Sequence, residues 1–412
     1  MEVKTCSGKL IISLLLLSFI LSLLMFIFKP ITQGQRYDLA LKLSLELLAV
    51  WVVFFSHPRW LGKKAVLAAV LVAGLALGLF QIKSLKPGQE IILTYRTVFQ
   101  DLEEGRNPYT SGRIYHRNAS GEVVYQNFNY PPLEIWPYYY FYRIFRLWDE
   151  KRLALFLIFL QSLAGLILVL TFRKNRPFPL HLLCFLPLLA FSEIKTNPAM
   201  TMLMVALFIW LISIQRKSKS MRLEIITAMV IGLGMMTKFL FSCIASTYYF
   251  WLIHSSFKKD SRAELQRIAF MISISFLVAL IAMRPFGPLN IIKSTVLFNL
   301  NPGVRNLYTT FYPNILSGLL CLINKNQVYP AVATVIIFLA LWISRKMSLF
   351  SAMLFVSTVF LLASPTPEPQ YFGTMLLLAL AGNIMENEPA KDPGRAEIPE
   401  RNCPDRPLNC LR

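Results

Sequence analysis

Carboxylates and turn-forming residues gather in one polar stretch of this chain, between residues 90 and 132. The stretch contains Glu90, the run DLEEGRNPY that begins at Asp101, and the run FNYPP that ends at Pro132. A carboxylate placed beside aromatic side chains could act as a general base towards a hydroxyl group. The alternative is a solvated loop in which Asn, Gly and Pro only form turns.

The rest of the chain is too apolar for a water-soluble protein of this size. Apolar residues make up 55% of the 412 residues and charged residues only 16%, and the mean hydropathy is positive. The 42 Lys and Arg residues, against 22 Asp and Glu, lie mostly in short gaps between apolar runs. That placement is typical of cytoplasmic loops and anionic lipid, so the expected surroundings are membrane lipids and no nucleic acid.

The sequence predicts an all-α integral membrane protein, a polytopic helical bundle of about twelve transmembrane helices. Residues 9–28 are expected to be an uncleaved anchor, and both termini are expected in the cytoplasm of a multi-pass plasma (cell) membrane protein. Two spans form a tight hairpin over 223–254 that turns near Thr237 and Lys238. The other expected spans are 9–28, 39–55, 65–82, 153–172, 178–191, 199–214, 265–283, 328–344, 349–363 and 372–384.

This topology places two long loops, about 83–148 and 284–327, outside the membrane, and a short surface helix is expected near 315–323. Residues 131–148 are aromatic but contain Pro137, so they are expected at the lipid headgroups and are left out of the spans. Residues 1–385 then form one membrane domain, and 386–412 form a disordered cytoplasmic tail. The polar clusters all fall at the external ends of spans.

The order of these clusters resembles the GT-C glycosyltransferases, and within them the family 87 mannosyltransferases that use polyprenol-phosphate-sugar donors. That family has an acidic residue after an early span, a Gly-x-Asn/Asp-Pro-Tyr turn and then Tyr-Pro-Pro. The matching residues here are Gly105, Asn107, Pro108, Tyr109, Tyr130, Pro131 and Pro132. Later family elements correspond to Asn197 before a span, Lys238 in a late hairpin, and Ser364 and Pro365 followed by Gln370 and Tyr371.

The chain departs from the family pattern at the acidic residue. An Asp usually precedes a Tyr by four residues in the family, and Tyr95 takes the Tyr position, so Ile91 stands where the Asp is expected. Glu90 is adjacent to that position, and Asp101 lies closer to the GRNPY turn. Glu90 is the first candidate for the catalytic base and Asp101 the second.

The resemblance implies an inverting glycosyltransferase that moves a hexose, with mannose as the expected sugar. The donor is a polyprenyl-phosphate sugar, and the acceptor is a lipid or glycan on the external face of the membrane. Cations hold the leaving phosphate without a nucleotide-binding fold, and the external candidates are Lys195, Lys238, Arg284 and Arg305. Their alternative role is interfacial snorkelling. Other substrate contacts are expected from Tyr95, Asn107, Tyr109, Tyr130, Asn197, Gln370 and Tyr371.

No metal and no other cofactor are expected, because the sequence contains no clustered His or Asp residues. The alternative functions are a membrane transporter or lipid-linked sugar flippase, and a catalytically inactive relative of the enzymes. A transporter should carry several ionisable residues at the middle of the membrane, whereas Glu46 is nearly alone there. The departure at Ile91 keeps the inactive relative open.

Replacement of the base should separate chemistry from binding. Glu90→Gln or Asp101→Asn should abolish sugar transfer and leave donor binding largely intact, because a general base acts in the transition state. Transfer and donor affinity are measured side by side in membranes that contain each variant. Full transfer by both variants would remove both residues from the catalytic candidates.

Overall fold

The computed structural model describes residues 90–117, 123–145, 149–172, 199–218, 220–297 and 329–363, with single positions between 374 and 385. Outside the described residues lie the predicted spans 9–28, 39–55, 65–82 and 178–191, the surface helix near 315–323, the tail 386–412 and much of 372–384.

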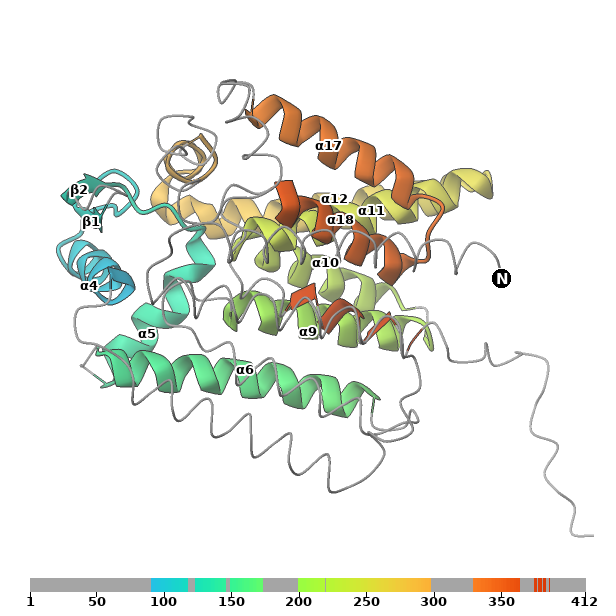
Figure 1. Ribbon diagram of the computed structural model, residues 1–412. Coiled ribbons are helices and arrows are strands. Elements are labelled where there is room, and N and C mark those ends of the chain that lie inside the picture. Colours follow the sequence, from blue (N-terminus) through green and yellow to red (C-terminus); the bar gives the residue numbers. More distant parts are fainter. Residues whose placement is uncertain are drawn as a thin grey trace, which may run out of the picture.

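The described part of the chain is mostly helical. Its longer helices are α4 (Glu90–Glu103), α5 (Trp136–Phe145), α6 (Glu150–Phe172), α9 (Ala199–Gln215), α10 (Met221–Met235), α11 (Phe239–Lys258), α12 (Arg262–Met283), α17 (Tyr329–Ser344) and α18 (Leu349–Ala363). The shorter elements are β1 (Ile114–Arg117), β2 (Val123–Gln126), η1 (Pro132–Glu134), η2 (Arg284–Phe286), α13 (Pro288–Ile291) and η3 (Ile292–Leu297). Figure 1 shows α4 and the two strands at one end of a bundle whose long helices run in roughly the same direction.

The predicted apolar runs coincide with helices wherever the structure describes them. Helices α6, α9, α12, α17 and α18 begin and end within a few residues of the predicted bounds. The predicted hairpin over 223–254 consists of α10 and α11, which are joined through Met236, Thr237 and Lys238. The pairs α6 with α9, α10 with α12, and α11 with α18 pack against each other. The all-α class is therefore confirmed in its coarse form.

Several helices present apolar side chains outwards. Among the described residues, one helix is long and apolar enough to cross a membrane: Arg262–Phe286, with 25 residues, a mean hydropathy of 2.0 and 22% of its most apolar window buried. Shorter apolar helices lie at Ala199–Gln215, Ala331–Ser344 and Leu349–Ala363. Phe276 and Ile281 on α12, and Phe338 and Trp342 on α17, are exposed. An apolar face of this kind is compatible with contact with lipid.

The polar stretch predicted as a turn-rich loop contains regular structure, so that prediction was wrong in two places. Helix α4 has no Gly or Pro and buries Ile92, Tyr95 and Phe99, whose spacing lies along one helical face. Strands β1 and β2 pair antiparallel with Tyr115 opposite Tyr125, because their sequences are rich in β-branched and aromatic residues. The hairpin is an exception to the all-α prediction, and the buried side chain of Ile114 anchors it.

The aromatic segment after the NYPP run forms a helix of 10 residues, α5. Pro137 does not break this helix, because it is the second residue, where no backbone donor is needed. At about 1.5 Å per residue, α5 is about 15 Å long, half of a hydrocarbon core. Tyr140, Ile144 and Phe145 are exposed on it. A helix of this length is too short to cross a hydrocarbon core by itself, and the location of the segment at the lipid headgroups stays a prediction.

Small residues bring α10 and α12 into close contact. The Ser275 hydroxyl donates to the carbonyl oxygen of Ala228 at 2.7 Å and lies 2.5 Å from the Tyr249 hydroxyl oxygen. A Cβ at Gly232 would lie 2.4 Å from the Ser275 carbonyl oxygen and 2.9 Å from the Val278 Cβ. Small residues at a helix interface allow this close approach of the two backbones.

Replacement of Gly232 tests this contact. Gly232→Ala should lower the free energy of unfolding by about 1–3 kcal/mol, because the new methyl group meets backbone that has to move. Met229→Ala, at a position of the same helix that is 44% exposed, is the control and should have a much smaller effect. Thermal unfolding of the detergent-solubilised variants measures both. A Gly232→Ala protein as stable as the wild type would show that α10 and α12 are not in close contact.

Candidate active site

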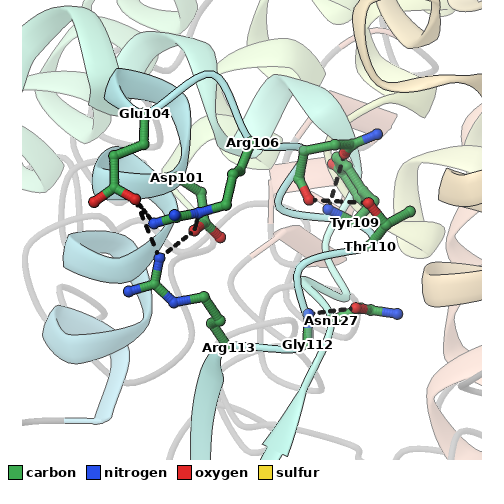
Figure 2. Close-up of polar contacts among 9 residues, drawn as sticks. Asp101, Glu104, Arg106, Tyr109, Thr110, Gly112, Arg113 and Asn127 are labelled. Carbon is green, nitrogen blue, oxygen red and sulfur yellow. Dashed lines mark hydrogen bonds and ion pairs between the residues drawn. The ribbon is translucent and has the colours of Figure 1, made fainter.

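An ion cluster fixes the turn that follows α4. The Asp101 carboxylate is fully buried, and its Oδ1 accepts hydrogen bonds from Arg106 Nε at 3.2 Å and Arg113 Nη1 at 3.1 Å. Glu104 pairs with both arginines (Figure 2). Gly105 begins the turn at φ 72°, a conformation that glycine adopts without strain. Asp101 therefore holds the GRNPY turn and the first strand against α4.

Asn107 and Tyr109 fasten this turn to distant parts of the chain. The Asn107 side chain accepts from the Tyr109 backbone N–H at 3.0 Å and donates to the Phe286 carbonyl oxygen at 2.7 Å. The buried Tyr109 hydroxyl donates to the Tyr130 carbonyl oxygen at 2.7 Å. The rings of Tyr109 and Phe286 have centroids 5.1 Å apart. These contacts join the GRNPY turn, the NYPP run and η2, which follows α12.

The turn between α10 and α11 places Lys238 beside the NYPP run. Thr237 is buried, and its hydroxyl donates to the Gly234 carbonyl oxygen at 2.6 Å and accepts from the Thr201 hydroxyl of α9 at 3.2 Å. Lys238 is extended at φ −143° and precedes the first residue of α11. The Leu133 backbone N–H donates to the Met236 carbonyl oxygen at 2.9 Å. The turn is thus bonded to both α9 and η1, which limits the positions open to Lys238.

The Lys238 ammonium group lies over an aromatic ring. Its Nζ is 3.6 Å from the centre of the Tyr130 ring, and the residue is only 5% exposed. A cation over a ring face gains electrostatic stabilisation that grows as water is removed. Tyr130, which belongs to the NYPP run, therefore helps to keep a positive charge buried at this end of the bundle.

Glu134 is the buried acid next to this lysine. It ends η1, is fully buried, and accepts a hydrogen bond at 3.4 Å from the hydroxyl of Tyr95 on α4. The rings of Tyr95 and Tyr138 pack in a tilted arrangement with centroids 4.9 Å apart, which limits the positions open to that hydroxyl. Tyr95, Glu134 and Lys238 thus bring together α4, η1 and the α10–α11 turn.

Burial governs the protonation of this acid. It raises the pKa of Glu134 from 4.5 to about 7, although the positive charge of Lys238 and the Tyr95 hydrogen bond both favour the carboxylate. Burial and the nearby charge of Glu134 also raise the pKa of Tyr109 well above its ordinary value. A carboxyl group with a pKa near 7 changes its charge in the physiological range. Such groups are common at functional sites.

The structure separates the predicted site residues into groups. Tyr95, Tyr130 and Lys238 meet around Glu134, with Tyr109 beside them, whereas Asp101 belongs to the ion cluster and Asn107 fastens the turn. Glu90 begins the 14-residue helix α4 and Asp101 lies near its end, so about 16 Å separates their backbones. Arg284 is exposed at the start of η2. Lys195, Asn197, Arg305, Gln370 and Tyr371 lie outside the described residues.

Sequence reasoning missed Glu134. It lies in an aromatic segment expected at the membrane interface. The candidates for the catalytic base came from the carboxylates of the preceding polar stretch. The available signal was a Glu directly after Tyr-Pro-Pro-Leu, followed by Ile and Trp. An acid in so apolar a run seldom becomes buried without a charged or hydrogen-bonding partner.

The described residues contain no group of three His, Cys, Asp or Glu side chains that could hold a metal ion. Comparison with protein families, curated proteins and solved structures finds no match to this chain. The chemistry that the site can perform follows from its contacts: a buried cation can bind an anion, and the acid beside it can bind a proton.

Glu134 makes the stability of the fold depend on pH. Between about pH 4.5 and pH 7 the folded protein keeps a proton on Glu134 that the unfolded chain releases, so stability falls as pH rises through this window. The Glu134→Gln variant has no titratable group at this position, so its stability does not fall for this reason. Its free energy of unfolding should therefore rise relative to wild type by on the order of 3 kcal/mol across the window.

Thermal unfolding in detergent at several pH values measures this difference. Glu103→Gln, which makes the same chemical change at an exposed position of α4, should follow the wild type at every pH. A constant difference between Glu134→Gln and wild type would mean that Glu134 does not titrate in this window.

Proposed function

We propose that this chain is a polytopic membrane glycosyltransferase of the GT-C type. It transfers a hexose, with mannose as the expected sugar, from a polyprenyl-phosphate-sugar donor to a lipid or glycan acceptor at the external face of the membrane. The observation that carries the proposal is the convergence of three segments that resemble family 87: the GRNPY turn, the NYPP run and the lysine of the late hairpin. Tyr109 donates to the Tyr130 backbone, and Lys238 covers the Tyr130 ring.

The helical architecture suits a donor with a lipid tail. The proposed bundle of about twelve spans places the apolar faces of α12 and α17 in lipid, with the candidate site at one end of the long helices. A polyprenyl chain then stays in the bilayer while its phosphate lies at the interface. The exposed aromatic residues of α5 belong at the same level, because amphipathic rings favour the headgroup region.

Lys238 is the cation proposed to hold the donor phosphate. A charge in a site that excludes water acts more strongly than a charge in bulk water, and Lys238 is both buried and held in place by its turn. As the sugar is transferred, the bond between the anomeric carbon and the phosphate oxygen breaks and its electron pair goes to the phosphate. A fixed cation stabilises the added negative charge at that moment.

The acceptor hydroxyl attacks the anomeric carbon from the opposite side, which inverts that centre, and its proton passes to a carboxylate. The Asp101 carboxylate is fully buried, and its Oδ1 accepts hydrogen bonds from two arginines that fix the GRNPY turn, so an acceptor hydroxyl does not reach it in this arrangement. Glu90 therefore stays the first candidate for this base. The leaving phosphate gains one negative charge, and the base gains the proton of the acceptor hydroxyl. The net charge is therefore conserved.

A membrane transporter, a lipid-linked sugar flippase and an inactive relative are the alternatives, and they differ from the enzyme in one observable. Membranes with and without the protein are supplied with polyprenyl-phosphate mannose that carries a radiolabel, and transfer to endogenous lipid or glycan acceptors is measured. A protein-dependent product supports the enzyme. The absence of product with several sugar-lipid donors would contradict it and favour transport or loss of activity.

The two lysines that flank α11 provide a matched pair for this assay. Lys238→Gln should lower kcat/KM by about 100-fold or more, because a fixed charge at the leaving phosphate is lost. Lys259→Gln, at the opposite end of the helix with a side chain that is 67% exposed, should retain activity. Equal activity of the two variants would remove Lys238 from the phosphate site.

A further inference from the structure

Glu134 and Lys238 are buried together, and their charges compensate each other. The acid is fully buried and the lysine is 5% exposed. The described groups that interact electrostatically with Glu134 come from three directions: the Lys238 ammonium from the α10–α11 turn, the Tyr95 hydroxyl from α4 and the Tyr109 hydroxyl from the GRNPY turn. Glu134 and Lys238 therefore lie within electrostatic reach of each other.

We propose that the site binds a proton at Glu134 whenever it binds an anionic phosphodiester at Lys238. The proposal rests on the function proposed above, since it assigns the donor phosphate to Lys238. It gives Glu134 a role distinct from that of the base: a positioning residue that frees the lysine charge for the donor.

Repulsion between two neighbouring buried anions is the physical reason for this coupling. With Glu134 ionised, a phosphodiester bound at Lys238 would place a second negative charge beside the carboxylate, in a place that excludes water. Such a charge is costly to bury. Protonation of Glu134 removes the repulsion between the carboxylate and the phosphate and keeps the attraction between Lys238 and the phosphate. The reciprocal statement also holds: a bound phosphate raises the proton affinity of Glu134.

The protonation equilibrium of Glu134 is close to balance before any ligand arrives. Burial raises its pKa to about 7, so this carboxyl group can take up a proton in the physiological range. Uptake of the proton therefore weakens binding little at pH 7 and progressively more above it. An acid with the ordinary glutamate pKa would instead oppose the phosphate throughout the physiological range.

A phosphodiester without a sugar tests the coupling apart from any transfer. The probe is a short-chain polyprenyl phosphate methyl ester, which keeps a single negative charge over the whole range and has no sugar to donate. Its affinity for the full-length protein in detergent is measured from about pH 6 to pH 9. Wild-type affinity should level off below about pH 7 and fall towards tenfold per pH unit above it, as expected for the uptake of one proton.

Two variants locate the proton. Glu134→Gln should bind the probe with little dependence on pH, at least as tightly as wild type at high pH. Glu103→Gln, at an exposed position of α4, should keep the wild-type dependence. A pH-independent wild type, or a Glu134→Gln protein with the wild-type dependence, would overturn the coupling.

Infrared difference spectroscopy of the wild type gives a readout that does not depend on the folding of a variant. Addition of the probe at about pH 8 should produce the band of a protonated carboxyl group. Absence of the band in a sample that binds the probe would overturn the proposal. Failure of the probe to bind at any pH would overturn the phosphate site as well. Normal coupling without sugar transfer to any acceptor would leave the coupling intact and contradict only the transferase.

Discussion

The burial of one negative and one positive charge at the same end of the helix bundle is the constraint on which the candidate site depends. Neither Glu134 nor Lys238 can stay buried cheaply without compensation, so η1 and the α10–α11 turn must remain together. The hydrogen bond from the Leu133 N–H to the Met236 carbonyl oxygen joins the same two segments through the backbone. Tyr95 adds α4 to them. Chain segments far apart in sequence are thereby held to one geometry.

The surrounding elements are built to keep that geometry. The Thr201 and Thr237 hydroxyls tie the lysine turn to α9, and close contact at Gly232 sets the distance between α10 and α12. At the other side, Asn107 bonds the GRNPY turn to the Phe286 carbonyl oxygen where α12 gives way to η2. The Asp101 cluster fixes the start of that turn. Residues that look catalytic by type, such as Asp101 and Asn107, are thus found to brace the site.

The sequence was informative where a pattern is local. Apolar length and basic flanks predicted α6, α9, α12, α17 and α18, and basic residues at both ends of 223–254 predicted the hairpin that carries Lys238. It was misleading in the stretch 90–132, where carboxylates and turn residues predicted a loop although residues 90–103 form a helix with one buried apolar face. The partner of Asn107 lies 179 positions away, and the burial of Glu134 depends on packing between segments. Spacing along one chain does not contain such information.

Lys238 is the residue proposed to hold the donor phosphate. An experimental structure of the protein with a non-transferable polyprenyl-phosphate-sugar analogue, obtained by electron cryomicroscopy in lipid, tests this directly. We expect a phosphate oxygen within hydrogen-bonding distance of Lys238 Nζ, beside the Tyr130 ring, with the Asp101 cluster unchanged. A phosphate bound elsewhere, for example by Arg106 and Arg113, with Lys238 still facing Glu134, would contradict it.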